Sequence, residues 1–87
     1  MREAAELQFP QQFPVKILGA DHAEFHAALA AIFAAHVAPI ETLTVARKPS
    51  SGGRYISVTV TFTATSRAQL DRLYGALSAS PQVLMAL

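Results

Sequence analysis

The chain lacks cysteine altogether, and this absence excludes several kinds of site. It removes a disulfide framework, a thiolate nucleophile and a cysteine-ligated zinc site. The 87 residues also contain no apolar run close to the roughly 20 residues of a membrane-spanning helix. The opening segment MREAAELQFP has no apolar signal-peptide core, so we expect a cytoplasmic protein.

Charged residues are scarce as well. They make up 15% of the chain and leave a net charge of +1, so the molecule as a whole offers no general attraction to nucleic acid or membranes. Hydrophobic residues reach 52%, which is too high for a disordered chain. The composition therefore predicts one small domain with its own core.

The spacing of apolar residues predicts the element order βαββαβ. Four segments have the composition or alternation of strands: residues 13–19, 40–48, 54–64 and 82–87. Two segments have the spacing of amphipathic helices, one capped by Asp21 and ending before Pro39, the other beginning at Thr65 or Ser66 and ending at Ser80-Pro81. Residues 1–12 are expected to form an N-terminal arm, and residues 13–87 a single domain.

The strand at 54–64 alternates cleanly and so defines two faces of the sheet. Tyr55, Ser57, Thr59 and Thr61 alternate with an apolar row. Paired residues share a face, so odd positions of 40–48 must pair with even positions of 54–64. A two-residue turn at Ser51-Gly52 satisfies this rule. The expected outward row is Lys16, Leu18, Thr42, Thr44, Ala46, Lys48, Tyr55, Ser57, Thr59 and Thr61.

Two amphipathic helices are available to cover the apolar face. With right-handed crossovers, the βαββαβ order then predicts an α+β, ferredoxin-like fold. Its sheet is four-stranded and antiparallel in the order 4-1-3-2, with both helices on one face. Pro49 cannot donate a ladder hydrogen bond, which agrees with an edge position for the second strand.

Parts of the sequence resemble a known family. The YbeD-like family of small uncharacterised bacterial proteins is similar to this chain in the blocks FPQQFPVKILG and KPSSGGRYISVTVTFTATSRAQLDRLYGAL, and in the ending VLMAL. The resemblance implies a ferredoxin-like fold similar to that of ACT domains, the ligand-sensing modules of amino-acid metabolism. It implies no activity, because the family has none established and a fold does not fix a function.

The turn between the second and third expected strands concentrates positive charge. Three cations, two hydroxyls and the loop amides favour a phosphate or carboxylate. The alternative is that the basic residues only protect an exposed edge strand from aggregation. The residues predicted to contact a ligand or partner are Lys16, Arg47, Lys48, Ser50, Ser51, Arg54 and Tyr55.

The outward face of the sheet suggests RNA binding as the alternative function. Ferredoxin-like domains that bind RNA stack bases on aromatic residues of the central strands. Only Tyr55 among the aromatic residues is expected to face outward here, which makes a poor stacking platform.

Catalytic and metal motifs are weak in this sequence. His22 and His26 lie one helical turn apart beside Asp21, but they lack a definite third zinc ligand and do not form an HExxH motif. No GxSxG motif is present. We therefore predict a non-catalytic regulatory or interaction module without cofactor or metal. It would bind a small anionic metabolite or a partner protein, as a monomer or a homodimer.

Overall fold

The structure is a computed structural model that describes residues 8–87. Its elements are β1 (Gln11–Ala20), α1 (Ala23–His36), the short 3₁₀ helix η2 (Ile40–Thr42), β2 (Thr44–Pro49), β3 (Tyr55–Ala64), α2 (Arg67–Ala79) and β4 (Met85–Ala86). Most of the arm predicted at residues 1–12 lies outside the described residues, and its last two residues belong to β1. Within residues 8–87, no helix is long and apolar enough to cross a membrane.

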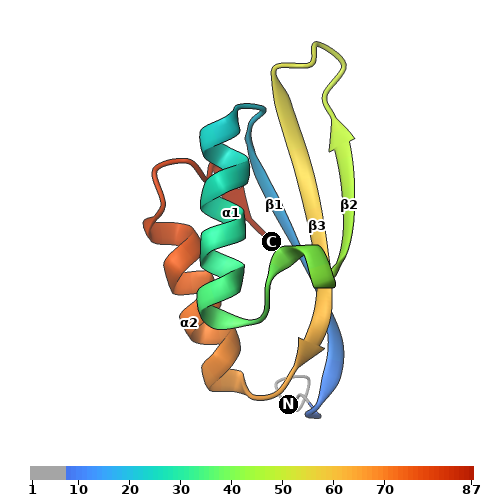
Figure 1. The fold of residues 1–87 in the computed structure, drawn as a ribbon, viewed down its shortest axis with the longest axis vertical. Coiled ribbons are helices and arrows are strands. Elements are labelled where there is room, and N and C mark those ends of the chain that lie inside the picture. Colours follow the sequence, from blue (N-terminus) through green and yellow to red (C-terminus); the bar gives the residue numbers. More distant parts are fainter. Residues whose placement is uncertain (1–7) are drawn as a thin grey trace, which may run out of the picture.

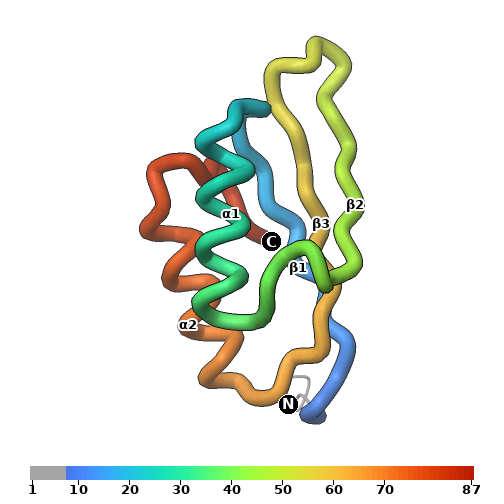
Figure 2. The backbone as a smooth tube through the Cα atoms, viewed as in Figure 1, coloured from blue at the N-terminus to red at the C-terminus, as the bar shows by residue number. Residues whose placement is uncertain are grey.

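The four strands form one antiparallel sheet in the order β2-β3-β1-β4. The long strands β1 and β3 are central, and β2 and β4 are the edges. Both helices lie on the same side of the sheet (Figure 1), and the backbone trace shows them next to each other (Figure 2). The predicted α+β, ferredoxin-like fold with strand order 4-1-3-2 is confirmed.

The core lies between the helices and one face of the sheet. The sheet contributes the apolar row predicted from β1 and β3, and each helix contributes three fully or nearly fully buried side chains. Phe33 of α1 meets Phe62 of β3 edge to face, with ring centroids 6.1 Å apart. The buried helix residues are Phe25, Leu29, Phe33, Leu70, Leu73 and Leu77.

The two helices begin differently. At α2, the Ser66 hydroxyl accepts the Gln69 N–H at 3.1 Å, so Ser66, one of the two predicted starts, is the N-cap. At α1, the prediction of Asp21 as the N-cap is wrong, because His22 occupies that position and makes no side-chain capping bond. The Asp21 carboxylate instead contacts His26 Nε2 at 2.8 Å.

The second strand is shorter than predicted. Residues 40–42 form η2, in which the Thr42 N–H donates to Pro39 O at 2.9 Å and the Thr42 hydroxyl donates to the same oxygen at 2.7 Å. These local bonds turn the chain before it enters the sheet, so β2 begins only at Thr44. The assignment of Thr42 to the outward row is therefore wrong.

The hairpin between β2 and β3 differs from the two-residue turn predicted at Ser51-Gly52. Pro49 pairs with Ile56, and the Ser50 N–H donates to Tyr55 O at 2.8 Å, so the loop comprises residues 51–54. Gly53 has φ 70°, a left-handed conformation that glycine adopts without strain. The loop is two residues longer than predicted, so odd positions of β2 still pair with even positions of β3.

The last strand contains only Met85–Ala86 rather than residues 82–87. The end of α2 explains the difference. The Val83 N–H donates to Ser80 O at 3.2 Å and the Gln82 N–H to Ser80 Oγ at 3.3 Å, which holds the chain in a turn. Only beyond this turn does the chain reach β1.

Candidate functional site

The open face of the sheet carries its side chains in rows that run across the strands. Lys48 of β2 pairs with Ser57 of β3, Ser57 pairs with Leu18 of β1, and Leu18 pairs with Met85 of β4. Directly paired residues point to the same face, so these four side chains form one row from edge to edge. The row is cationic at the β2 edge and apolar at the β4 edge.

A shallow pocket of about 280 Å³ lies on this face near the β2–β3 hairpin. It contains both lysines of the open face together with serine hydroxyls and apolar side chains. Four of the seven predicted contact residues, Lys16, Lys48, Ser50 and Tyr55, meet here. The full lining is Lys16, Leu18, Lys48, Pro49, Ser50, Tyr55, Ile56 and Ser57.

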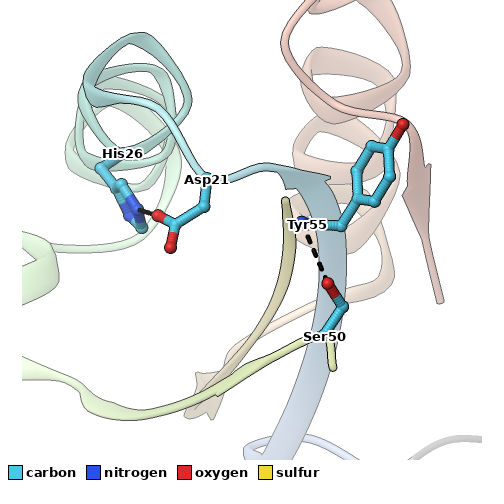
Figure 3. Close-up of polar contacts among 4 residues, drawn as sticks. All are labelled: Asp21, His26, Ser50 and Tyr55. Atoms are coloured by element: carbon cyan, nitrogen blue, oxygen red, sulfur yellow. Dashed lines mark hydrogen bonds and ion pairs between the residues drawn. The ribbon is translucent and has the colours of Figure 1, made fainter. Parts of the chain in front are cut away.

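The hairpin fixes the position of Ser50 in this pocket. Its hydroxyl oxygen accepts the Tyr55 N–H at 3.2 Å (Figure 3), which leaves the hydroxyl proton available to an acceptor in the pocket. Two loop amides are already used, because the Ser50 N–H donates to Tyr55 O and the Gly53 N–H donates to Ser50 O at 2.9 Å. An anion would therefore meet side chains here, not these two amides.

Three predicted contact residues do not line the pocket. Arg47 pairs with Val58, so it points to the side of the sheet where the helices lie, opposite to Lys48. Ser51 and Arg54 lie exposed in the hairpin loop. The Arg54 carbonyl accepts the Asp21 N–H at 3.0 Å, which ties this loop to the start of α1. The alternation of β2 thus divides the basic cluster between two sides.

The pocket lysines have no carboxylate partner among residues 8–87. The ion pairs in this part of the chain are His26–Asp21, at 2.8 Å, and Arg67–Asp71, at 3.7 Å. None of these four residues lines the pocket. The described residues therefore leave two positive charges on an open surface that also offers hydroxyl and apolar groups.

The histidines of α1 do not gather a metal site. His26 and Asp21 contact each other, each with its side chain 36% exposed, and the Tyr55 ring points away from them (Figure 3). In the part of the chain that the structure describes, no group of three histidine or carboxylate side chains is placed to share a metal ion. The zinc alternative thus has no third ligand there.

Comparison with known proteins decides the family. The model of the family described as "Protein of unknown function (DUF493)" matches residues 4–87. The chain belongs to this family. It is 42% identical over 80 residues to a UPF0250 protein of Chromobacterium violaceum, covering 92% of this chain and 90% of that protein. It is 37% identical to a UPF0250 protein of Nitrosomonas europaea over the whole length of both. These matches confirm the resemblance to the YbeD-like proteins.

Solved structures similar to this DUF493 chain support the fold alone. The solution structure of protein HP0495 from H. pylori aligns with a TM-score of 0.62 at 10% identity, over 94% of this chain and 86% of that one. The C-terminal domain of the MgtC protein from Mycobacterium tuberculosis aligns with a TM-score of 0.60 at 21% identity, over 95% and 89%. At such identities, similarity of fold carries no function.

The prediction from the sequence missed four residues that line the pocket. Leu18 and Ser57 were placed on the open face but not in the site, and the register that joins them to Lys48 is the signal that links them. Pro49 and Ile56 belong to the opposite row, yet they line the pocket at the end of β2. No sequence pattern places them there.

Proposed function

We propose that this protein is a non-catalytic binding module whose open sheet face receives an anionic group. The group is a carboxylate or phosphate, carried by a small metabolite or by an acidic segment of a partner protein. The observation that carries the proposal is the meeting of Lys16, Lys48 and the Ser50 hydroxyl in one pocket. Lysine ammonium and serine hydroxyl groups are both donors suited to an oxyanion.

The shape of the pocket favours a small group. Sites that enclose a whole drug-sized ligand usually occupy roughly 300–1,000 Å³. A shallow hollow of about 280 Å³ fits one charged head group with a short apolar part against Leu18 and Tyr55. The module would act by binding this group in the pocket, without converting it, as a regulatory or interaction protein does.

The chemistry of the lining supports a binding role. Its eight residues include no histidine, aspartate or glutamate. Those side chains are the ones that most often transfer protons near neutral pH. The hydroxyls of Ser50 and Ser57 thus have no such general base within the pocket lining to activate them.

An NMR titration tests the proposal. Inorganic phosphate, glutamate and a glutamate-rich peptide are added separately to the isotope-labelled protein. We expect saturable shifts at the amides of Leu18, Tyr55 and Ser57 that weaken as salt is raised. Response to phosphate or glutamate identifies a metabolite-type ligand, and response to the peptide alone identifies an acidic partner.

The matched variants remove two charges each. Lys16→Gln combined with Lys48→Gln should abolish the shifts. Arg67→Gln combined with Arg72→Gln changes the net charge equally on exposed α2 and should leave them intact. Equal loss in both double variants, or no shifts with any probe, would refute the anion-binding proposal.

RNA binding is the second candidate, favoured by one observation. Tyr55 is 45% exposed on the open face, beside the two lysines. An unstructured oligoribonucleotide should then bind with a steep salt dependence, and Tyr55→Ala should weaken it at least about fivefold, since stacking on an aromatic residue contributes about 1–3 kcal/mol per base. Affinity that is unchanged in Tyr55→Ala would exclude base stacking at this site.

A further inference from the structure

The two edges of the sheet differ in how they resist pairing with another strand. β2 ends in Arg47, Lys48 and Pro49, and charged side chains and proline on an edge oppose further pairing. β4 has no such protection, because residues 73–87 contain no charged side chain. Instead the segment exposes three large apolar residues, with exposed fractions of 65% for Leu84, 51% for Met85 and 61% for Leu87.

The backbone of β4 shows which groups point outward. The Leu87 N–H donates to Lys16 O at 2.8 Å, and the Lys16 N–H donates to Leu87 O at 3.1 Å. Successive residues of an antiparallel strand alternate in direction, so the N–H and C=O of the preceding residue, Ala86, point away from β1. Ala86 therefore presents one donor and one acceptor at the open edge.

We propose that this edge is a self-association site, at which β4 pairs antiparallel with β4 of a second copy of the chain. The two Ala86 residues would exchange N–H···O=C bonds across a two-fold axis. This register places Met85 opposite Leu87 of the second copy, and Leu87 opposite its Met85, on the open face. The two sheets would join into one, with the helices of both copies on the same side.

A second copy suits this edge because the edge is complementary to itself. A two-fold interface requires each residue to meet its counterpart reciprocally, and the Met85–Leu87 spacing around Ala86 does so. Cross-strand apolar pairs of this kind stabilise a sheet. Like charges are kept apart, since the two Lys16 residues would lie three strand spacings, about 14 Å, from each other. That exceeds the Debye length of about 8 Å at physiological ionic strength.

The short strand also sets the strength of association. β4 has two residues, so the contact includes few backbone bonds and a small apolar area. Interfaces at the small end of the size range are weak and transient. We therefore expect a reversible dimer that forms as protein concentration rises.

Sedimentation and hydrogen exchange of the full chain test the site. Between micromolar and millimolar concentration, the sedimentation coefficient should rise from the monomer to the dimer value, and exchange of the Ala86 amide should slow in parallel. A sedimentation coefficient that stays at the monomer value throughout, or a dimer that leaves the Ala86 amide unprotected, would overturn the proposal.

Charge variants test the register. Met85→Glu combined with Leu87→Glu sets like charges opposite each other across the axis and should keep the chain monomeric. Position 87 pairs with Lys16 of its own chain, so a carboxylate there does not repel β1. Met85→Lys combined with Leu87→Glu sets opposite charges across the axis and should restore the dimer. As a control for added charge, Thr44→Glu combined with Ala46→Glu on exposed β2 should dimerise like the parent chain.

The variants also separate self-association from loss of folding. All substituted side chains are exposed, and circular dichroism of each variant should match the parent chain. A dimer that persists in the Glu/Glu variant, or that is not restored in the folded Lys/Glu variant, would contradict the β4 register. Neither result depends on the anion-binding pocket.

Discussion

The two faces of the sheet are made by the same strands, yet they differ in almost every physical respect. On the covered face, Val58 and Val60 of β3 are 1% and 0% exposed and pack beneath two helices. Thr59 lies between them in β3 and points to the opposite face, where its side chain is half-buried. Neither helix lies on that side of the sheet (Figure 1). This difference in burial assigns a different role to each face. The covered face supplies folding free energy, and the open face is left to present charge, hydroxyls and an aromatic ring.

Truncating one aromatic residue on each face should give the largest contrast. Phe33→Ala removes a fully buried ring that packs against Phe62, and it should lower the free energy of unfolding by about 3–5 kcal/mol. Tyr55→Ala removes a ring that is 45% exposed and should cost less than about 1 kcal/mol, the range of strand propensities. Urea unfolding of both variants measures the difference, and similar costs would contradict the assignment of stability to one face.

Adding a single methyl group should change stability in opposite directions at a packed position of the covered face and at an exposed position of a helix. A Cβ at Gly19 would collide with the Phe25 ring and lie 2.9 Å from Gln82 O, so Gly19→Ala should destabilise the fold by about 1–3 kcal/mol. A Cβ at Gly75, on the exposed side of α2, would meet nothing within 4 Å. Gly75→Ala should therefore stabilise the helix by about 0.5–1 kcal/mol.

Thermal unfolding of the two glycine variants checks these signs. The midpoint should fall in Gly19→Ala and rise in Gly75→Ala. A Gly19→Ala variant as stable as the parent chain would mean that Phe25 shifts to another rotamer at no cost. The tight packing at the end of β1 would then be less specific than the structure implies.

The two faces were predictable from the sequence because side chains of a strand alternate between faces with a period of two. The expected turn at Ser51-Gly52 was wrong, and the true loop is longer by two residues. An even error leaves every side chain of β2 on its predicted face, so Lys48 still reaches the pocket beside Ser57. One residue of error would have turned Lys48 inward and removed it from the site.

Element lengths were less predictable, because local hydrogen bonds compete with the sheet. Thr42 bonds to Pro39 and Val83 bonds to Ser80, and each bond holds in a turn a residue that was expected in a strand. The predicted cap of α1 was wrong in a similar way, since the Asp21 carboxylate contacts the His26 side chain instead of capping the helix. The register of β2 already implies that Arg47 and Lys48 point to opposite faces. The prediction nevertheless grouped them in one site because they are adjacent in the sequence.

The smallest expected effect concerns the hydrogen bond that attaches the end of β4 to helix α2. The Tyr74 hydroxyl of α2 donates to Leu87 O at 3.1 Å. Removing it in Tyr74→Phe should cost about 0.5–1.5 kcal/mol at neutral pH, the net contribution of one hydrogen bond. Amide exchange at Leu87 should accelerate in the variant.

The same Tyr74 hydroxyl should make the stability of the protein depend on pH in the alkaline range. Burial raises the pKa of Tyr74 above its ordinary value, so the folded chain keeps this proton after the unfolded chain has lost it. The stabilisation is complete below about pH 10 and is lost as pH rises through the folded pKa. Urea unfolding from neutral pH to about pH 11 should therefore show a steeper loss in the parent chain and in Tyr55→Phe than in Tyr74→Phe. Equal slopes in all three would mean that the partly buried Tyr74 hydroxyl does not link β4 to α2.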